Sequence, residues 1–147
     1  MKYVSNSLEE TEKIAQNFIA TLSLKSTAVV VGLYGQLGAG KTAFAQLAAR
    51  ALGVEEEITS PTFVIEKIYD LTDRKFAHLV HIDAYRLEKS EELLHLGWNE
   101  LTADPKNLIL IEWPEKVANI MPPHIEVRLK TLDSGEAREI EIHNLEQ

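Results

Sequence analysis

One stretch constrains this chain more than any other part of its sequence: Gly35-Gln36-Leu37-Gly38-Ala39-Gly40-Lys41-Thr42, called the phosphate loop below. It fits the pattern G-x-x-x-x-G-K-[ST] at every fixed position. Glycines in such a loop let backbone N–H groups turn toward an anion, because no Cβ stands in the way. The lysine can reach the β- and γ-phosphates of a nucleotide, and the threonine hydroxyl can bind Mg²⁺. The stretch therefore predicts a nucleotide-phosphate site.

The segments on either side of the phosphate loop are the ones that its mechanism requires. Residues 28–34, Ala-Val-Val-Val-Gly-Leu-Tyr, form a short apolar run typical of a buried strand. Residues 41–52 carry apolar side chains at helical spacing and are followed by Gly53, a common helix stop. A helix beginning at Lys41 would add its positive end to the attraction for phosphate. The local pattern thus predicts strand, loop and helix in that order.

The rest of the sequence predicts one α/β domain over residues 1–147. A capping-box pattern at Ser7 predicts a helix running to about Leu22. A second helix is expected over residues 91–101, and a strand over the apolar run 108–111. Two antiparallel hairpins are expected, pairing residues 63–70 with 76–83 and residues 124–132 with 137–143. The expected fold is a P-loop NTPase-like three-layer sandwich with a mostly parallel central sheet and antiparallel hairpins.

The composition of the chain indicates which kinds of partner it can bind and in which compartment it is expected. The chain has 15 Lys and Arg against 23 Asp and Glu, a net charge of −8. Such a surface attracts nucleic acid poorly, so we expect no strong direct nucleic-acid binding. The chain has no cysteine, no secretion signal at its beginning, and no apolar run of about 20 residues that could span a membrane. We therefore expect a cytoplasmic protein without a membrane partner.

Two acids are candidates for the carboxylate that a phosphate-loop enzyme needs opposite its loop threonine. Glu112 ends the apolar run 108–111, which is typical of a central strand buried on both faces. Asp83 ends residues 76–82, a more mixed run that contains His78 and His81. The pattern favours Glu112 as the metal-side acid, with Asp83 positioning water or a metal ligand. Either acid could instead be a surface residue past a strand end, and we interpret both histidines as structural.

A middle loop and two tryptophans complete the candidate residues. Pro61 breaks regular structure around Ser60 and Thr62, so this segment is either an ordinary loop or a switch that presents a hydroxyl to the γ-phosphate. Trp113 directly follows Glu112 and is expected near the nucleotide, whereas Trp98 is expected in the core.

Four segments in this order resemble the TsaE family, also called YjeE, over essentially the full chain. They are the phosphate loop, Ser60-Pro61-Thr62-Phe63, His81-Ile82-Asp83-Ala84-Tyr85-Arg86-Leu87 and Ile111-Glu112-Trp113-Pro114-Glu115. The resemblance implies a small ATPase required to form threonylcarbamoyl-adenosine (t6A) at adenosine 37 of tRNAs that read codons beginning with A. It also implies TsaD and TsaB as partners.

The resemblance implies ATP and Mg²⁺ as ligands and assigns roles to individual residues. Thr42 and Glu112 would hold the metal, and the phosphates would lie among Gly38, Ala39, Gly40, Lys41 and Thr42. Thr11 stands where the family has a threonine near the nucleotide, and Thr62, Asp83 and Trp113 match positions tied to nucleotide binding or hydrolysis. At Ala43 many family members have a threonine; the backbone N–H remains, so we expect weaker nucleotide binding.

Two other functions fit the phosphate loop. A small-molecule kinase needs an acceptor pocket and an arginine-bearing lid, and no lid-like insertion is visible in the sequence. A nucleotide-sensing module would bind without meaningful turnover. Release of phosphate, its transfer to a small acceptor, or neither would distinguish the three. The arginine nearest in sequence to a nucleotide motif is Arg86, which is either a catalytic arginine or the partner of a local acid such as Glu88.

Overall fold

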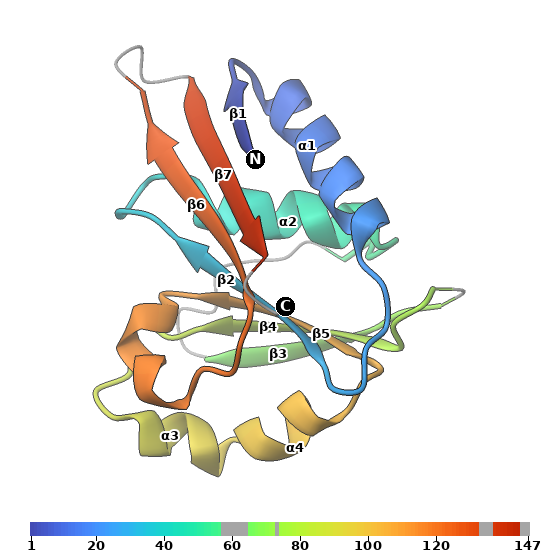
Figure 1. Cartoon of the computed structure of the whole chain (residues 1–147), viewed down its shortest axis with the longest axis vertical. Helices are drawn as coiled ribbons and strands as arrows, with labels where there is room; N and C mark the ends of the chain where they lie inside the picture. The colour runs from blue at the N-terminus through green and yellow to red at the C-terminus, as the bar shows by residue number, and fades with distance from the viewer. Residues whose placement is uncertain (57–64, 73, 133–136, 145–147) are drawn as a thin grey trace.

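The chain is described by a computed structural model that covers residues 1–56, 65–72, 74–132 and 137–144. Figure 1 shows one twisted sheet with helices on both of its faces. The described strands are β1 (Lys2–Ser5), β2 (Val29–Tyr34), β3 (Glu66–Asp70), β4 (His78–Asp83), β5 (Asn107–Glu112), β6 (Ile125–Thr131) and β7 (Arg138–Asn144).

Parallel strands form the middle of the sheet, and antiparallel strands form its two sides. The strand order is β1-β7-β6-β2-β5-β4-β3. β6, β2, β5 and β4 run parallel, while β3 pairs antiparallel with β4, and β7 with both β6 and β1. The expected α/β sheet and both hairpins are therefore confirmed.

Alternating side chains of the buried strands create two separate cores. Helices α1 (Leu8–Thr21) and α2 (Lys41–Ala51) cover one face, and α3 (Ser90–His95), α4 (Trp98–Ala103) and the 3₁₀ helix η1 (Pro114–Ile120) cover the other. On β5, Leu108 and Leu110 face the α1–α2 core, whereas Ile109 and Ile111 face the opposite core. This period of two is what a strand buried on both faces requires. Trp98 is 1% exposed, so its expected core position is confirmed.

The structure corrects the sequence-based expectations at three places. The helix expected over residues 91–101 is two helices, because Gly97 adopts a left-handed backbone (φ 89°) between α3 and α4. The strand β1 and the helix η1 were not predicted. β4 is almost fully buried, although its two histidines had indicated a more exposed strand. Its side chains enter both cores, Leu79 the α1–α2 core and Val80 and Ile82 the opposite one, so both of its faces are covered.

This topology brings the candidate residues to one edge of the sheet. β2, β4 and β5 are parallel, so the phosphate loop after β2 and the acids at the ends of β4 and β5 share that edge. Asp83 and Glu112 are direct register partners. None of the helices in the described ranges is long and apolar enough to cross a membrane.

Candidate nucleotide site

The phosphate loop connects β2 to α2 through backbone conformations that favour glycine. Gly38 and Gly40 have φ values of 82° and 101°, and Gly40 is the N-cap of α2. Gly35 has a different constraint: a Cβ there would lie 2.6 Å from the carbonyl oxygen of Leu129 on β6. The glycines therefore allow both the turn and its close approach to the neighbouring strand.

Lys41 is buried and occupies a defined position at the start of α2. Its ammonium group donates a hydrogen bond to the carbonyl oxygen of Gly35 and lies 3.2 Å from the centre of the Trp113 ring. Burial lowers the pKa of this ammonium group from its ordinary value, while the carboxylates of Glu115, Glu112 and Asp83 act in the opposite direction. The positive charge thus lies between the loop backbone and an aromatic face.

Trp113 has a strained backbone. Its φ is 60°, and among the described residues no other non-glycine residue has a positive φ. Trp113 is also the N-cap of η1. The Tyr85 ring lies 5.1 Å from the Trp113 ring at an angle of 51°. Such strain clusters at functional sites, since it persists only where the surroundings hold it. Trp113 is therefore fixed against Lys41 by the turn that follows β5.

The carboxylate of Glu112 is buried and bound on both oxygens. Its Oε1 accepts a hydrogen bond from Thr42 Oγ1 at 2.8 Å, and its Oε2 lies 2.7 Å from His81 Nε2. Asp83, on the neighbouring strand, accepts a hydrogen bond from the backbone N–H of Tyr85 at 3.0 Å. Of the two acids, Glu112 is the one that contacts the loop threonine.

The sequence-based interpretation missed the role of His81 in this arrangement. His78 and His81 contact different acids: His78 Nε2 lies 3.4 Å from Asp70 Oδ1, and His81 contacts Glu112. His81, however, stands two residues before Asp83 and therefore faces the same side of β4. That period-two relation was the available signal, but the contact with Glu112 also needs the register of β4 beside β5.

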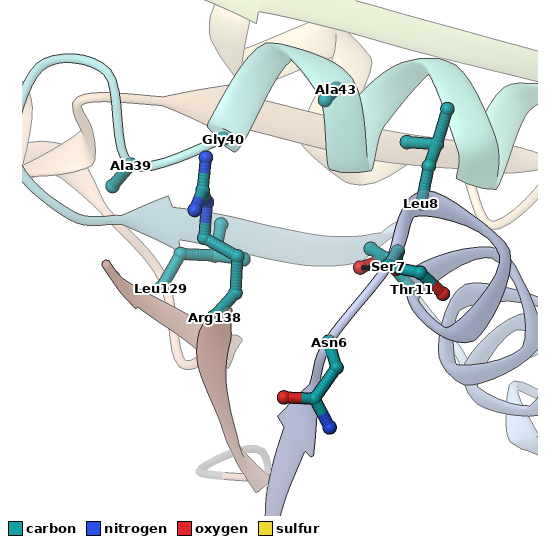
Figure 2. A pocket seen from close by; sticks show the side chains of 9 residues that line it. All are labelled: Asn6, Ser7, Leu8, Thr11, Ala39, Gly40, Ala43, Leu129 and Arg138. Carbon is teal, nitrogen blue, oxygen red and sulfur yellow. Dashed lines mark hydrogen bonds between the residues drawn. The ribbon is translucent and has the colours of Figure 1, made fainter. Parts of the chain in front are cut away.

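A cavity of about 460 Å³ borders the phosphate loop at Ala39 and Gly40. Figure 2 shows its lining, which comes from the start of α1, the phosphate loop, α2, β6 and β7: Asn6, Ser7, Leu8, Thr11, Ala39, Gly40, Ala43, Leu129 and Arg138. Thr11 is buried, and its Oγ1 lies 2.6 Å from Ser5 Oγ. The structure thus places Thr11, Ala39, Gly40 and Ala43 around one cavity, apart from Thr42 and Glu112.

Arg138 was missed by the sequence reasoning. Its side chain extends from β7 toward Gly40, and a Cβ on Gly40 would lie 3.6 Å from its Nε (Figure 2). No motif marked it, because it reaches the loop only through the pairing of β7 with β6 and of β6 with β2. Arg86 is exposed, and no ion pair in the described part of the chain joins it to Glu88. Thr62 lies outside the described residues.

Comparisons with known proteins agree on one family. The model of the family "Threonylcarbamoyl adenosine biosynthesis protein TsaE" matches residues 5–140. A protein of Rickettsia prowazekii named tRNA threonylcarbamoyladenosine biosynthesis protein TsaE is 41% identical over 88% of this chain and 86% of its own length. A protein of the same name from Treponema pallidum is 37% identical over 97% and 99%. The crystal structure of Bacillus subtilis YdiB superposes with a TM-score of 0.75 at 29% identity, covering 99% of this chain and 85% of that one.

Proposed function

Because this chain belongs to the TsaE family, we propose that it is a magnesium-dependent ATPase that serves the formation of t6A at adenosine 37 of tRNAs reading codons that begin with A. The names of its relatives support the pathway. The proposal of ATP hydrolysis rests on one observation: Thr42, the last residue of the phosphate loop, donates a hydrogen bond to Glu112 at the end of β5.

Thr42 and Glu112 fit a magnesium ion that binds together with a nucleotide. Thr42 and Glu112 present a hydroxyl and a carboxylate side by side, which are hard oxygen ligands of the kind that Mg²⁺ prefers. Within the described ranges, no three His, Asp or Glu side chains gather as a metal site. That also fits Mg²⁺, which proteins often hold through one or two side chains together with phosphate oxygens and water. When bound, Mg²⁺ would neutralise charge on the phosphates.

Lys41 and the loop backbone would provide the remaining positive charge. The ammonium group of Lys41 is already at the loop, and binding of phosphate requires it to exchange contacts with Gly35 and Trp113 for phosphate oxygens. The N-terminus of α2 adds backbone N–H groups. In this proposal Asp83 positions the attacking water, and Trp113 senses occupancy because it contacts Lys41. We also assign Thr62 to this site, on its match to the family alone.

The cavity of Figure 2 would hold the nucleoside half of ATP. It shares Ala39 and Gly40 with the phosphate loop, so a nucleotide bound to the loop can extend into it. Thr11 and Arg138 supply polar groups on its walls. A guanidinium group this close to the loop can donate charge-assisted hydrogen bonds to phosphate or ribose oxygens.

TsaD and TsaB are the proposed partners, and the cytoplasm is the proposed compartment. A chain of net charge −8 holds tRNA poorly by itself, and a more basic partner could hold it instead. Fast phosphoryl transfer also needs charge beyond Lys41 and Mg²⁺, and an arginine finger supplied by a partner is worth roughly 10³–10⁵ in rate. We therefore expect slow hydrolysis alone and stimulation by the partner complex.

The test is steady-state phosphate release from ATP, measured for the chain alone and with TsaD, TsaB and tRNA. The wild type should be slow alone and faster in the complex, and Lys41→Ala should be inactive in both. Arg138→Ala should weaken nucleotide binding about tenfold, as expected for loss of a charge-assisted hydrogen bond. Arg50→Ala serves as the matched control, because Arg50 is exposed in the last turn of α2 and pairs with Glu12. Transfer of phosphate to a small acceptor would indicate a kinase, and binding without turnover a sensing module; either result contradicts the proposal.

A further inference from the structure

His81 is a polar side chain in the middle of an apolar strand. It is 1% exposed, and its neighbours Leu79, Val80 and Ile82 are fully buried. Nε2 lies 2.7 Å from Glu112 Oε2, but Nδ1 is buried and has no hydrogen-bond partner among the residues that the structure describes. A buried polar atom without a partner costs stability, so packing alone does not explain a histidine at this position.

The contact with Glu112 offers an explanation. An ionised carboxylate only accepts hydrogen bonds, so Nε2 must donate to Oε2 when Glu112 is charged. Thr42 contacts the other oxygen, Oε1, from α2. The two contacts come from different elements, a strand and a helix, and together they fix the plane of the carboxylate.

We propose that His81 is a positioning residue that holds Oε2 of Glu112, so that Oε1 stays directed at Thr42 and the metal that accompanies the nucleotide. Within the described part of the chain, His81 makes no hydrogen bond or ring contact with the phosphate loop, including Lys41, so it acts through Glu112. This inference rests on the proposed function, because it takes Glu112 as the metal-side acid. Groups that orient metal ligands affect metal affinity by about 10- to 100-fold.

The experiment measures binding of fluorescent mant-ADP in EDTA and across a magnesium titration. Three variants are compared with the wild type: His81→Leu, His81→Gln and the control His78→Leu. His78 lies at the other end of β4, has a partly exposed side chain and pairs with Asp70 instead. The readout is the gain in mant-ADP affinity that Mg²⁺ produces, and it does not depend on turnover.

We expect His81→Leu to bind mant-ADP normally in EDTA and to require about 10- to 100-fold more Mg²⁺ for the gain. His81→Gln should need less Mg²⁺ than His81→Leu, since the glutamine amide can donate a hydrogen bond to Oε2 of Glu112. The control His78→Leu should match the wild type. A structural role alone would lower the affinity in EDTA as well. If His81→Leu does not fold, a folded His81→Gln with no better Mg²⁺ response than Glu112→Gln overturns the inference.

Failure of this inference is distinguishable from failure of the proposed function. If Mg²⁺ does not strengthen binding to the wild type, or if Glu112→Gln leaves the gain unchanged, the metal assignment is wrong. If Glu112→Gln loses the gain while His81→Leu keeps it, only the role of His81 is wrong.

Discussion

Replacing Glu112 by alanine and by glutamine should separate two roles of this side chain. Both variants remove the buried charge, so the free energy of desolvating that charge is the same in both and cancels in their comparison. Glutamine can accept from His81 with its oxygen and donate to Thr42 with its amide group. Alanine does neither, which leaves Nε2 of His81 without a partner at a site where the ring is 1% exposed.

The expected difference follows from these contacts. An unsatisfied buried donor costs about 1–3 kcal/mol, and loss of one buried methylene group, Cγ, costs about 0.8 kcal/mol. Thr42 is partly exposed and can turn its hydroxyl to water, so it adds little. Glu112→Ala should therefore be about 2–4 kcal/mol less stable than Glu112→Gln, or lower in Tm by roughly 4–16 °C for a chain of this size.

The assay is urea denaturation followed by far-UV circular dichroism, in EDTA and without nucleotide. Magnesium-dependent mant-ADP binding should be lost equally in both variants, since neither offers a carboxylate. A stability difference below about 1 kcal/mol, smaller than one unsatisfied donor should produce, would refute the contact network of His81, Glu112 and Thr42 in the free protein.

Three further predictions concern the loop and its neighbours. Burial lowers the pKa of Lys41, so in EDTA the affinity for mant-ADP should fall as the pH rises toward the ordinary lysine pKa of about 10.4. Folding disfavours the charged form of Lys41, so the cost of this group to the free energy of unfolding should shrink over the same pH range. Affinity that stays constant up to pH 10 would contradict this. Trp113→Phe should abolish the nucleotide-dependent fluorescence change, because the Trp113 ring contacts Lys41 whereas Trp98 is 1% exposed in the core; a signal that persists would assign it to Trp98. Gly35→Ala should lower the free energy of unfolding by about 1–3 kcal/mol, because its Cβ would meet the carbonyl of Leu129 at 2.6 Å; a urea midpoint equal to that of the wild type would contradict the close approach.

Features encoded by neighbouring residues could be predicted without coordinates. The strand, phosphate loop and helix depend on glycine conformations, β-branched residues and helical spacing within residues 28–53. The two hairpins follow from alternation around polar turns, and Glu112 follows from an apolar run that ends in an acid. These signals are local, so the sequence determined the fold class and the candidate phosphate site.

Contacts between residues distant in the chain were decided only by the tertiary structure. His81 meets Glu112 because β4 lies beside β5 in one register, and Arg138 approaches Gly40 because β7 pairs with β6. Lys41 lies on Trp113 because a left-handed residue turns the chain after β5. Strand order and register depend on the free energy of burying both faces of the whole sheet, which no short stretch of sequence contains.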